Sequence, residues 1–279
     1  MLLKTFAERI LFPDTIVDEK RLKQLIKGKT IVITGASFGI GEQLAVLFSD
    51  YNVRLVLIAR TEPKLKQLSK TLSAHGSQCR FIAADLYQES EVDRVIQELK
   101  MLPEGIDIFI SNAGKSINRS LIQSLSRYHD FTRTNSLNYL APVKLLLAIT
   151  PILAAQKGQV INVSAINVLL LPAPGWAAYQ ASKTAFDQWF RANFAEWKMM
   201  GIHAKTIYLP LVRTGMITPN NKYTTYPAMQ PEQAAIRIAR LICSPNNYCK
   251  PWWLIFGQVV NFIGRPLWEM LTYTYLKKR

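Results

Sequence analysis

The chain has 279 residues, of which 49% are apolar, and this content suits one substantial buried core. The formal net charge is +15, which indicates either a surface that attracts phosphates or a basic, solvated one. Lysine and arginine are scattered, and no nucleic-acid-binding pattern is present, so we expect no nucleic-acid partner. Three cysteines without paired spacing exclude a disulfide framework or a zinc site and indicate a reducing, cytoplasmic compartment.

Residues 1–27 form an N-terminal extension that opens with an amphipathic helical pattern. The apolar residues near one face are Leu2, Leu3, Phe6, Ile10 and Leu11. Charged residues break this run, which is therefore unlike the apolar region of a signal peptide. We expect the extension to dock on its own domain, and contact with a membrane or a partner is the alternative.

The central region, residues 28–250, alternates between short β-branched runs and helical stretches such as 41–49 and 62–73. The runs predicted as buried strands are residues 30–34, 53–59, 80–84, 106–110, 159–163 and 202–209. This alternation predicts a single α/β domain with a doubly wound parallel sheet, the Rossmann arrangement.

Residues 251–279 form a C-terminal segment rich in aromatic residues that ends in three cations. Arg265, Pro266 and Glu269 interrupt its apolar run, so we expect no transmembrane span. Aromatic and cationic residues together are typical of a membrane interface. A subunit contact or a lid packed on the domain is the alternative.

A glycine-rich loop follows the first predicted strand and opens the next predicted helix. Glycine permits a tight turn and lets backbone N–H groups approach a pyrophosphate, which the helix N-terminus then faces. The strand and helix on either side support this interpretation. The predicted dinucleotide-binding residues of the loop are Gly35, Ser37, Phe38, Gly39, Ile40 and Gly41.

The ends of the next three predicted strands extend this site. Arg60 ends the second strand, where an NAD site usually carries an acid. A guanidinium can instead hold a 2′-phosphate, so the predicted cofactor is NADP(H). Asp85 after the third strand is placed to bond the adenine. After the fourth, the small residues Asn112, Ala113 and Gly114 leave room for the adenosine ribose.

Tyr179 and Lys183 lie at the start of a predicted helix, and their i, i+4 spacing places both side chains on one face. A phenol with a pKa of about 10 is a poor acid or base at neutral pH, and a nearby ammonium lowers that pKa. Tyr179 is therefore the predicted acid/base for a substrate oxygen. Lys183 is predicted to lower the Tyr179 pKa and to hold the nicotinamide ribose.

The segments TGASFGIG, Asp85, NAG and YQASK resemble the short-chain dehydrogenase/reductase superfamily over about residues 28–245. The resemblance implies that Asn138 is the helix asparagine that positions a proton-relay water, with Asn135 as the competing position. It also implies that Pro210 and Thr214 grip the nicotinamide carboxamide. Members are often homo-oligomers through the helix that carries the tyrosine. The aromatic residues suited to such a contact, or to the core, are Trp189, Phe190, Phe194 and Trp197.

The sequence departs from the family after the fifth strand. Members usually carry two serines there, and the second orients the substrate oxygen. Here the two positions are Ser164 and Ala165, and Ser164 lies 15 residues before Tyr179. One residue is inserted in the loop that follows. Ser164 takes the role if the loop shifts. Otherwise Asn167 donates the hydrogen bond, or Tyr179 alone holds the oxygen.

The predicted substrate pocket is apolar and aromatic, because residues 169–174, Trp176 and the loop 215–230 would line it. Such a pocket favours a hydrophobic small molecule, although these residues could equally pack on the core. Several segments resemble bacterial short-chain-type fatty acyl-CoA reductases, which make an aldehyde with NADPH. In that case nearby cations could meet the phosphates of CoA or remain solvated; they are Lys115, Arg119, Arg127 and Arg133.

The leading hypothesis is therefore an NADP(H)-dependent oxidoreductase that reduces a hydrophobic carbonyl or acyl thioester. Tyr179, Lys183, Asn138 and Ser164 are its predicted catalytic residues. The same site could work as an alcohol or hydroxysteroid dehydrogenase. A non-catalytic NADP(H)-binding protein at a membrane or in a complex is the alternative from a different class. We expect a cytoplasmic protein, with peripheral membrane attachment through its termini as an open alternative.

Overall fold

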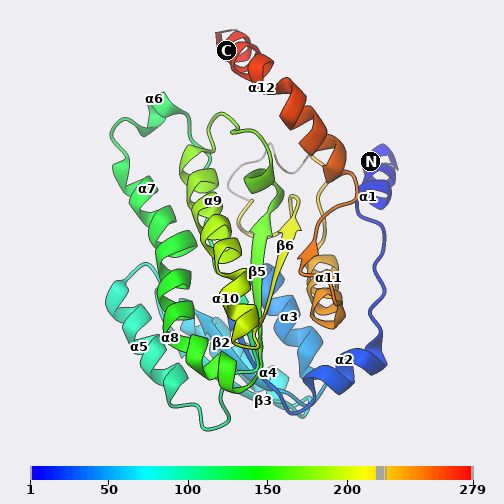
Figure 1. Cartoon of the computed structure of the whole chain (residues 1–279), viewed down its shortest axis with the longest axis vertical. Helices are drawn as coiled ribbons and strands as arrows, with labels where there is room; N and C mark the ends of the chain where they lie inside the picture. The colour runs from blue at the N-terminus through cyan, green and yellow to red at the C-terminus, as the bar shows by residue number, and fades with distance from the viewer. Residues whose placement is uncertain (1, 218–222, 224, 278–279) are drawn as a thin grey trace.

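The computed structural model describes residues 2–217, 223 and 225–277, and Figure 1 shows a central sheet between two layers of helices. All described strand pairs are parallel, and the strand order is β3-β2-β1-β4-β5-β6-β7. The strands are β1 Thr30–Thr34, β2 Arg54–Ala59, β3 Gln78–Ala83, β4 Ile108–Ser111, β5 Gln159–Ala165, β6 His203–Leu209 and β7 Tyr248–Cys249. The predicted doubly wound α/β fold is confirmed.

Both faces of the sheet are covered, which explains why its strands read as nearly continuous apolar runs. On β1, Ile31 and Ile33 pack into one apolar cluster, and Val32 between them packs into the other. The helices of the first face are α2 Glu19–Ile26, α3 Gly39–Ser49, α4 Glu62–Ser73 and α11 Pro231–Cys243. Those of the second are α5 Glu89–Lys100, α8 Ala141–Ala155, α9 Ala177–Ala192 and α10 Phe194–Met199.

Of the seven strands in the described part of the chain, six lie where the sequence predicts them, within one or two residues at most ends. The prediction missed β7, which has two residues and pairs only with β6, through Thr206 and Ile207. β4 begins later than predicted. The residue before it, Asp107, turns its carboxylate to the Thr30 N–H and the Lys29 ammonium.

The aromatic residues of α9 and α10 pack on one another within the chain. Phe190 and Trp197 are buried, with ring centroids 4.9 Å apart, and Trp189 and Phe194 are half-buried beside them. The core alternative of the sequence prediction therefore accounts for these residues.

The N-terminal helix α1 Leu2–Leu11 docks on its own domain, as expected for this extension. The indole N–H groups of Trp252 and Trp253 donate to the carbonyls of Ile10 and Leu11, at 3.1 and 3.2 Å. Phe12, which directly follows the helix, is buried in the core. The end of α1 and the segment that leads into α12 are thus bound to each other near α11 (Figure 1).

The C-terminal helix α12 Leu254–Lys277 extends away from the body of the protein in Figure 1, and Leu254 is its one buried residue among those described. One helical run in the described part of the chain, residues 128–155, is long and apolar enough to cross a bilayer. This run carries α8, which packs Leu145, Ile149 and Leu153 against the sheet. It is therefore a core helix of this fold.

Candidate active site

The glycine loop after β1 is closed by contacts that leave no room for a side chain at two of its glycines. A Cβ on Gly41 would lie 2.3 Å from the Gly35 carbonyl oxygen, and one on Gly35 would lie 2.9 Å from the Ala113 Cα. Gly35 and Gly39 also have positive φ angles, of 68° and 59°. The sequence prediction of a tight turn here agrees with this geometry.

The loop presents the N-terminus of α3 at the carboxyl end of the sheet. Phe38 is the N-cap residue, and its side chain makes no capping hydrogen bond, so the first N–H groups of α3 keep their capacity to bind an anion. Phe38 itself is exposed, with the Lys64 ammonium 5.7 Å from its ring centroid. A dinucleotide pyrophosphate fits this arrangement.

Asn112 and Ala113 brace the glycine loop from the neighbouring strand β4. The Asn112 side-chain amide donates to the carbonyls of Thr34 and Gly35, at 2.9 and 3.2 Å. The N–H groups of Asn112 and Ala113 both donate to the Thr34 hydroxyl, at 3.0 Å each. Sequence reasoning missed Thr34, because a threonine inside a β-branched strand carries no distinguishing signal.

An open pocket of about 380 Å³ lies between the loop that follows β3 and the end of α7 Tyr128–Asn135. Its walls include Asp85, Tyr87 and Arg133, and the Arg133 guanidinium stands 5.3 Å from the Tyr87 ring centroid. Burial raises the pKa of Tyr87, and the nearby charges of Arg133 and Arg60 partly offset that rise. β2 and β3 end side by side, with Ala59 opposite Ala83, so the predicted 2′-phosphate residue Arg60 and the predicted adenine residue Asp85 follow neighbouring strand ends.

Lys183 and Asn138 come together around Gly114. A Cβ built on Gly114 would lie 3.3 Å from Asn138 Oδ1 and 3.4 Å from Lys183 Nζ. The Lys183 ammonium donates to the Val163 carbonyl at 3.2 Å, at the end of β5. Tyr179 lies one turn before Lys183 on α9, half-buried, with its ring centroid 5.7 Å from that of Trp176. The structure thus brings the predicted tyrosine, lysine and asparagine to one end of the sheet.

Asn138 occupies a wide turn of the chain, the π-helix η1 Ser136–Leu140 between α7 Tyr128–Asn135 and α8. Its side chain is fully engaged: it accepts from the Lys115 N–H and donates to the Lys115 carbonyl and the Ser182 hydroxyl, at 2.8, 2.9 and 2.9 Å. Asn138 therefore fixes the segment after β4 against α9. Such wide turns are frequent at functional sites.

The pKa values of the pair differ from the sequence expectation. Burial raises the pKa of Tyr179 to about 12, whereas Lys183 was predicted to lower it. Burial also lowers the pKa of Lys183 to about 8, and the carboxylate of Asp187 opposes that change. The physical reason is desolvation, together with the direction of the Lys183 ammonium, which points to the Val163 carbonyl.

Ser164 lies buried at the end of β5, and among the described residues no hydrogen bond joins its hydroxyl to Tyr179. It is close to Asp187, where burial raises the pKa of the carboxyl and Arg191, Tyr208 and Ser164 oppose the rise. Asn167 follows in the short helix η2 Ile166–Leu169, and its side-chain oxygen is buried without a hydrogen-bond partner. The Ser164 hydroxyl is likewise buried without a hydrogen-bond partner among the described residues, so the choice between Ser164 and Asn167 stays a prediction.

The loop that carries Asn167 is held by Gln180, the neighbour of Tyr179. Its amide donates to the Asn167 carbonyl at 2.7 Å and accepts from the Ala173 N–H at 3.1 Å. Trp176 packs near Tyr223, with ring centroids 5.7 Å apart, so aromatic rings surround the approach to Tyr179. Residues 218–222 and 224 of the predicted substrate loop lie outside the described residues.

Two of the cations considered for CoA share one buried carboxylate. Arg119 and Arg127 both pair with Asp130, at 2.8 and 3.1 Å. Two guanidinium groups against one carboxylate leave excess positive charge beside the loop that leads into α9, where the Arg119 N–H donates to the Gly175 carbonyl at 2.7 Å.

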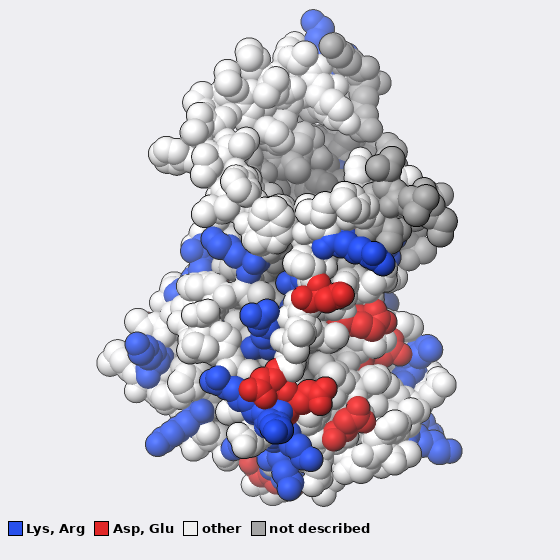
Figure 2. All heavy atoms as spheres, turned by 90° about the vertical axis from the view of Figure 1, so that its right-hand side faces the viewer, with Lys and Arg blue, Asp and Glu red and all other residues white. Residues whose placement is uncertain are grey.

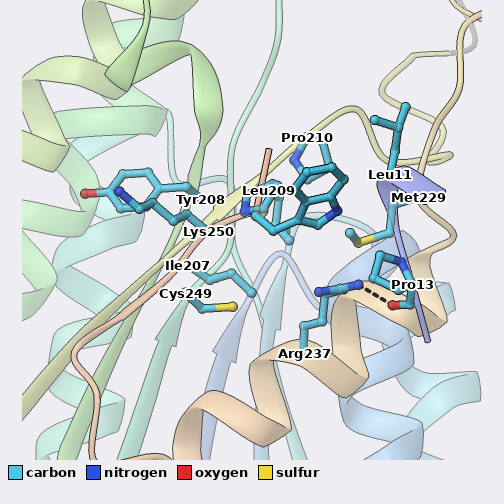
Figure 3. A pocket seen from close by; sticks show the side chains of 12 residues that line it. Leu11, Pro13, Ile207, Tyr208, Leu209, Pro210, Met229, Arg237, Cys249 and Lys250 are labelled. Atoms are coloured by element: carbon cyan, nitrogen blue, oxygen red, sulfur yellow. Dashed lines mark hydrogen bonds between the residues drawn. The ribbon is translucent and has the colours of Figure 1, made fainter. Parts of the chain in front are cut away.

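Pro210 and Thr214 follow β6, and Thr214 reaches the glycine loop, because a Cβ on Gly39 would lie 2.8 Å from Thr214 Cγ2. Pro210 also lines a separate cavity of about 20 Å³ between the chain ends, β6 and α11 (Figure 3). In that view Arg237 points to the Pro13 carbonyl, to which it donates at 2.5 Å. The cavity has room for about one water molecule and belongs to the packing of the chain ends.

A doubly wound sheet with a glycine loop at its switch point defines a dinucleotide-binding fold. The family model for short chain dehydrogenases matches residues 29–224, and the chain belongs to the short-chain dehydrogenase/reductase family. It is an oxidoreductase of that family.

Curated relatives include two fatty acyl-CoA reductases. The chain is 38% identical to one from Acinetobacter baylyi, covering 78% of this chain and 74% of the relative. It is 35% identical to one from Mycobacterium tuberculosis, covering 80% and 76%. A very-long-chain 3-oxoacyl-CoA reductase of Neurospora crassa is 30% identical, covering 85% and 74%.

Solved structures share the fold. A short-chain dehydrogenase from Sphingobium yanoikuyae in complex with NADPH matches with a TM-score of 0.72 at 23% identity, covering 87% of this chain and 95% of that one. The L-sorbose reductase of Gluconobacter frateurii, complexed with NADPH and L-sorbose, matches with a TM-score of 0.70 at 24% identity, covering 79% and 91%.

Proposed function

We propose that the protein reduces a long-chain acyl thioester, of the fatty acyl-CoA kind, to an aldehyde with NADPH. The observation that carries this proposal is the convergence of Lys183, Asn138 and the Tyr179 helix beside the glycine loop. The names of the two relatives described above support the substrate class. Arg60 at the end of β2 supports NADPH over NADH, because its guanidinium can pair with a 2′-phosphate.

NADPH, when bound, supplies the hydride that reduces the thioester carbonyl carbon. Tyr179 donates its phenolic proton to the carbonyl oxygen, which gives a hemithioacetal. Loss of the CoA thiol from that species leaves the aldehyde, and the thiol sulfur carries the proton away. The Lys183 ammonium stabilises the charge left on the Tyr179 oxygen until a proton from solvent replaces it.

With a pKa of about 12 the phenol of Tyr179 keeps its proton at neutral pH, which is the form with which a reduction begins. The same shift makes it a weak acid, so it gives up that proton only as the carbonyl oxygen gains negative charge from the hydride. An alcohol dehydrogenase would need the same oxygen as a base, which requires the phenolate. The aromatic rings of Trp176 and Tyr223 near Tyr179 suit an acyl chain, and the excess positive charge near Arg119 suits the CoA phosphates.

The test is NADPH oxidation at 340 nm with palmitoyl-CoA, a long-chain aldehyde, an acetoacetyl thioester and a ketosteroid. We expect turnover with palmitoyl-CoA and a loss of at least about 1,000-fold in the Tyr179→Phe variant, which removes the proton donor. NADPH binding, followed by cofactor fluorescence, should be unchanged in that variant.

Turnover with the ketosteroid alone would replace the proposal by a hydroxysteroid activity. Tight NADPH binding with no turnover of any substrate would favour the non-catalytic binding protein. A Tyr179→Phe variant that keeps most of its rate would refute the role given to Tyr179.

A further inference from the structure

The outer surface of α12 is apolar along nearly its whole length. A helix of 24 residues is about 36 Å long. Phe262 and Ile263 in its middle are 87% and 70% exposed. The other exposed large apolar residues of the helix are Ile255, Phe256, Val259, Val260, Leu267, Met270, Leu271, Tyr273, Tyr275 and Leu276. A soluble protein rarely leaves so long an apolar surface uncovered.

A second exposed apolar cluster lies on α6 Leu121–Ser124 and the residues after it. Leu121 and Ile122 are 78% and 81% exposed, and Leu125 and Tyr128 are comparably exposed. In Figure 1, α6 and α12 stand at the same end of the molecule, beyond the carboxyl ends of β5 and β6. This is the end at which the glycine loop and Tyr179 lie.

Both elements contact the loop that leads into the Tyr179 helix. The Trp268 indole N–H of α12 donates to the Pro172 carbonyl at 2.9 Å. From the other side, the Arg119 N–H, just before α6, donates to the Gly175 carbonyl at 2.7 Å. The two apolar surfaces thus flank the approach to the candidate active site.

The charged residues around this surface indicate which kind of partner it fits. Residues 251–279 carry one acidic residue, Glu269, against the cations Arg265, Lys277, Lys278 and Arg279. On the face shown in Figure 2 the described atoms of the upper part carry almost no charge, two groups of basic side chains lie beneath it, and acidic and basic side chains are mixed lower down. Apolar side chains with cations beneath them match the acyl chains and head groups of an anionic bilayer.

A second copy of the chain fits this surface less well, because two segments with the same excess of cations would repel each other. A membrane-spanning helix fits less well too. Arg265, Pro266 and Glu269 lie near the middle of α12, where a spanning helix would have to bury them in hydrocarbon.

We propose that the outer face of α12 and the exposed cluster of α6 together dock on an anionic lipid bilayer. The docked protein holds the approach to Tyr179 against the lipid surface, from which a long acyl substrate can enter the site. The docking stands on the exposed surfaces alone, whereas the entry of the substrate rests on the proposed function.

The experiment is flotation of the full-length protein with vesicles of phosphatidylcholine alone or mixed with equal parts of phosphatidylglycerol. We expect the protein to float with the mixed vesicles and to be released by an alkaline carbonate wash. The double variants Phe262→Glu/Ile263→Glu and Leu121→Glu/Ile122→Glu should each lower the bound fraction by at least about tenfold, because each loses the burial of two large side chains.

The matched control is Met199→Glu. Met199 is 88% exposed and ends α10 just before β6 begins, so it lies at the amino end of the sheet, opposite the proposed surface. This variant should float like the wild type. All variants should keep wild-type NADPH turnover with a substrate dissolved in lipid-free buffer, so loss of docking is separated from loss of activity.

Wild-type protein that stays out of the floating fraction would overturn the proposal. So would α12 or α6 double variants that float as well as the wild type, or bound protein that resists the carbonate wash. A dimer in sedimentation that the α12 variant dissociates, without flotation, would assign the surface to a second copy instead.

Discussion

Burial shifts the pKa values of Tyr179 and Lys183 in opposite directions. The phenol keeps its proton to higher pH, and the ammonium loses its proton at lower pH than a free lysine does. Each group is thereby moved toward its neutral form, as desolvation requires. For reduction, the neutral phenol is the form needed at the start of the reaction. The ammonium is needed once the phenol has given up its proton.

The pH profile of the reductive reaction should therefore follow Lys183. Its pKa of about 8 means that the ammonium is present at neutral pH and is lost as the pH rises through that value. We expect kcat/KM for the acyl thioester to fall above about pH 8, measured from about pH 6 to about pH 10.

The control for this profile is Lys183→Arg, whose guanidinium stays charged over the whole range. This variant should have a lower rate but no decline near pH 8. A wild-type profile that stays level to pH 10, or an equal decline in Lys183→Arg, would show that Lys183 does not determine the pH dependence.

At the residue scale, either Ser164 or Asn167 orients the substrate oxygen. The Ser164 hydroxyl and the Asn167 side-chain oxygen are both buried without a hydrogen-bond partner among the described residues. The Ser164 hydroxyl lies beside the Asp187 carboxyl, which competes for its proton, whereas the Asn167 amide N–H groups can donate to a substrate oxygen. We therefore expect Asn167→Ala to lower kcat by about 10- to 100-fold with little change in NADPH affinity. Ser164→Ala should change kcat by less than about threefold. Single-turnover kinetics of the two variants side by side would decide, and the reverse order would return the role to Ser164.

At the scale of elements, the glycine loop is set by close backbone contact rather than by flexibility alone. Gly41 belongs to α3, where alanine would normally be favoured. A Cβ there would meet the backbone carbonyl oxygen of Gly35 at 2.3 Å, and backbone cannot give way as a side chain can. The helix start, the turn and strand β4 thus depend on one another.

Gly41→Ala should consequently weaken NADPH binding by at least about tenfold and lower stability by about 1–3 kcal/mol. The matched control is Gly264→Ala in α12, where the nearest atom to the added Cβ is 4.0 Å away. That variant should bind NADPH like the wild type. Cofactor titration and thermal unfolding of both variants test this. Equal NADPH affinities would show that the loop accommodates a side chain at Gly41 without losing its cofactor-binding geometry.

Elements with a strong local pattern were predictable from sequence. The run TIVIT becomes β1 at its predicted bounds, and the helix of Tyr179 and Lys183 begins where the motif indicates. β7 was not predictable, because two residues have no periodicity of their own. The position of the Ser164 hydroxyl beside Asp187 depends on tertiary packing, which no local pattern encodes. The same holds for the pairing of Arg119 and Arg127 with Asp130.

At the scale of the whole molecule, the N-terminal helix α1 is tied to the segment that reaches the cofactor site. α1 contacts the segment after β6 through Glu8, which pairs with Arg213 and accepts from the Ala228 N–H at 3.1 Å. Arg213 directly precedes Thr214, which reaches the glycine loop. The extension is therefore part of the scaffold of the cofactor site, and residues more than 200 positions apart in sequence hold it there.

Replacing Glu8 should test this connection. Glu8→Ala leaves the half-buried Arg213 and the Ala228 N–H without their acceptor, so we expect a loss of about 1–3 kcal/mol in the free energy of unfolding. NADPH affinity should fall with it, because the segment that carries Thr214 loses its anchor. Glu98→Ala, which breaks the exposed pair with Arg94, should cost less than about 1 kcal/mol and leave affinity unchanged. Denaturant unfolding and cofactor titration of the two variants give both quantities, and equal small losses would mean that α1 is only attached to the domain.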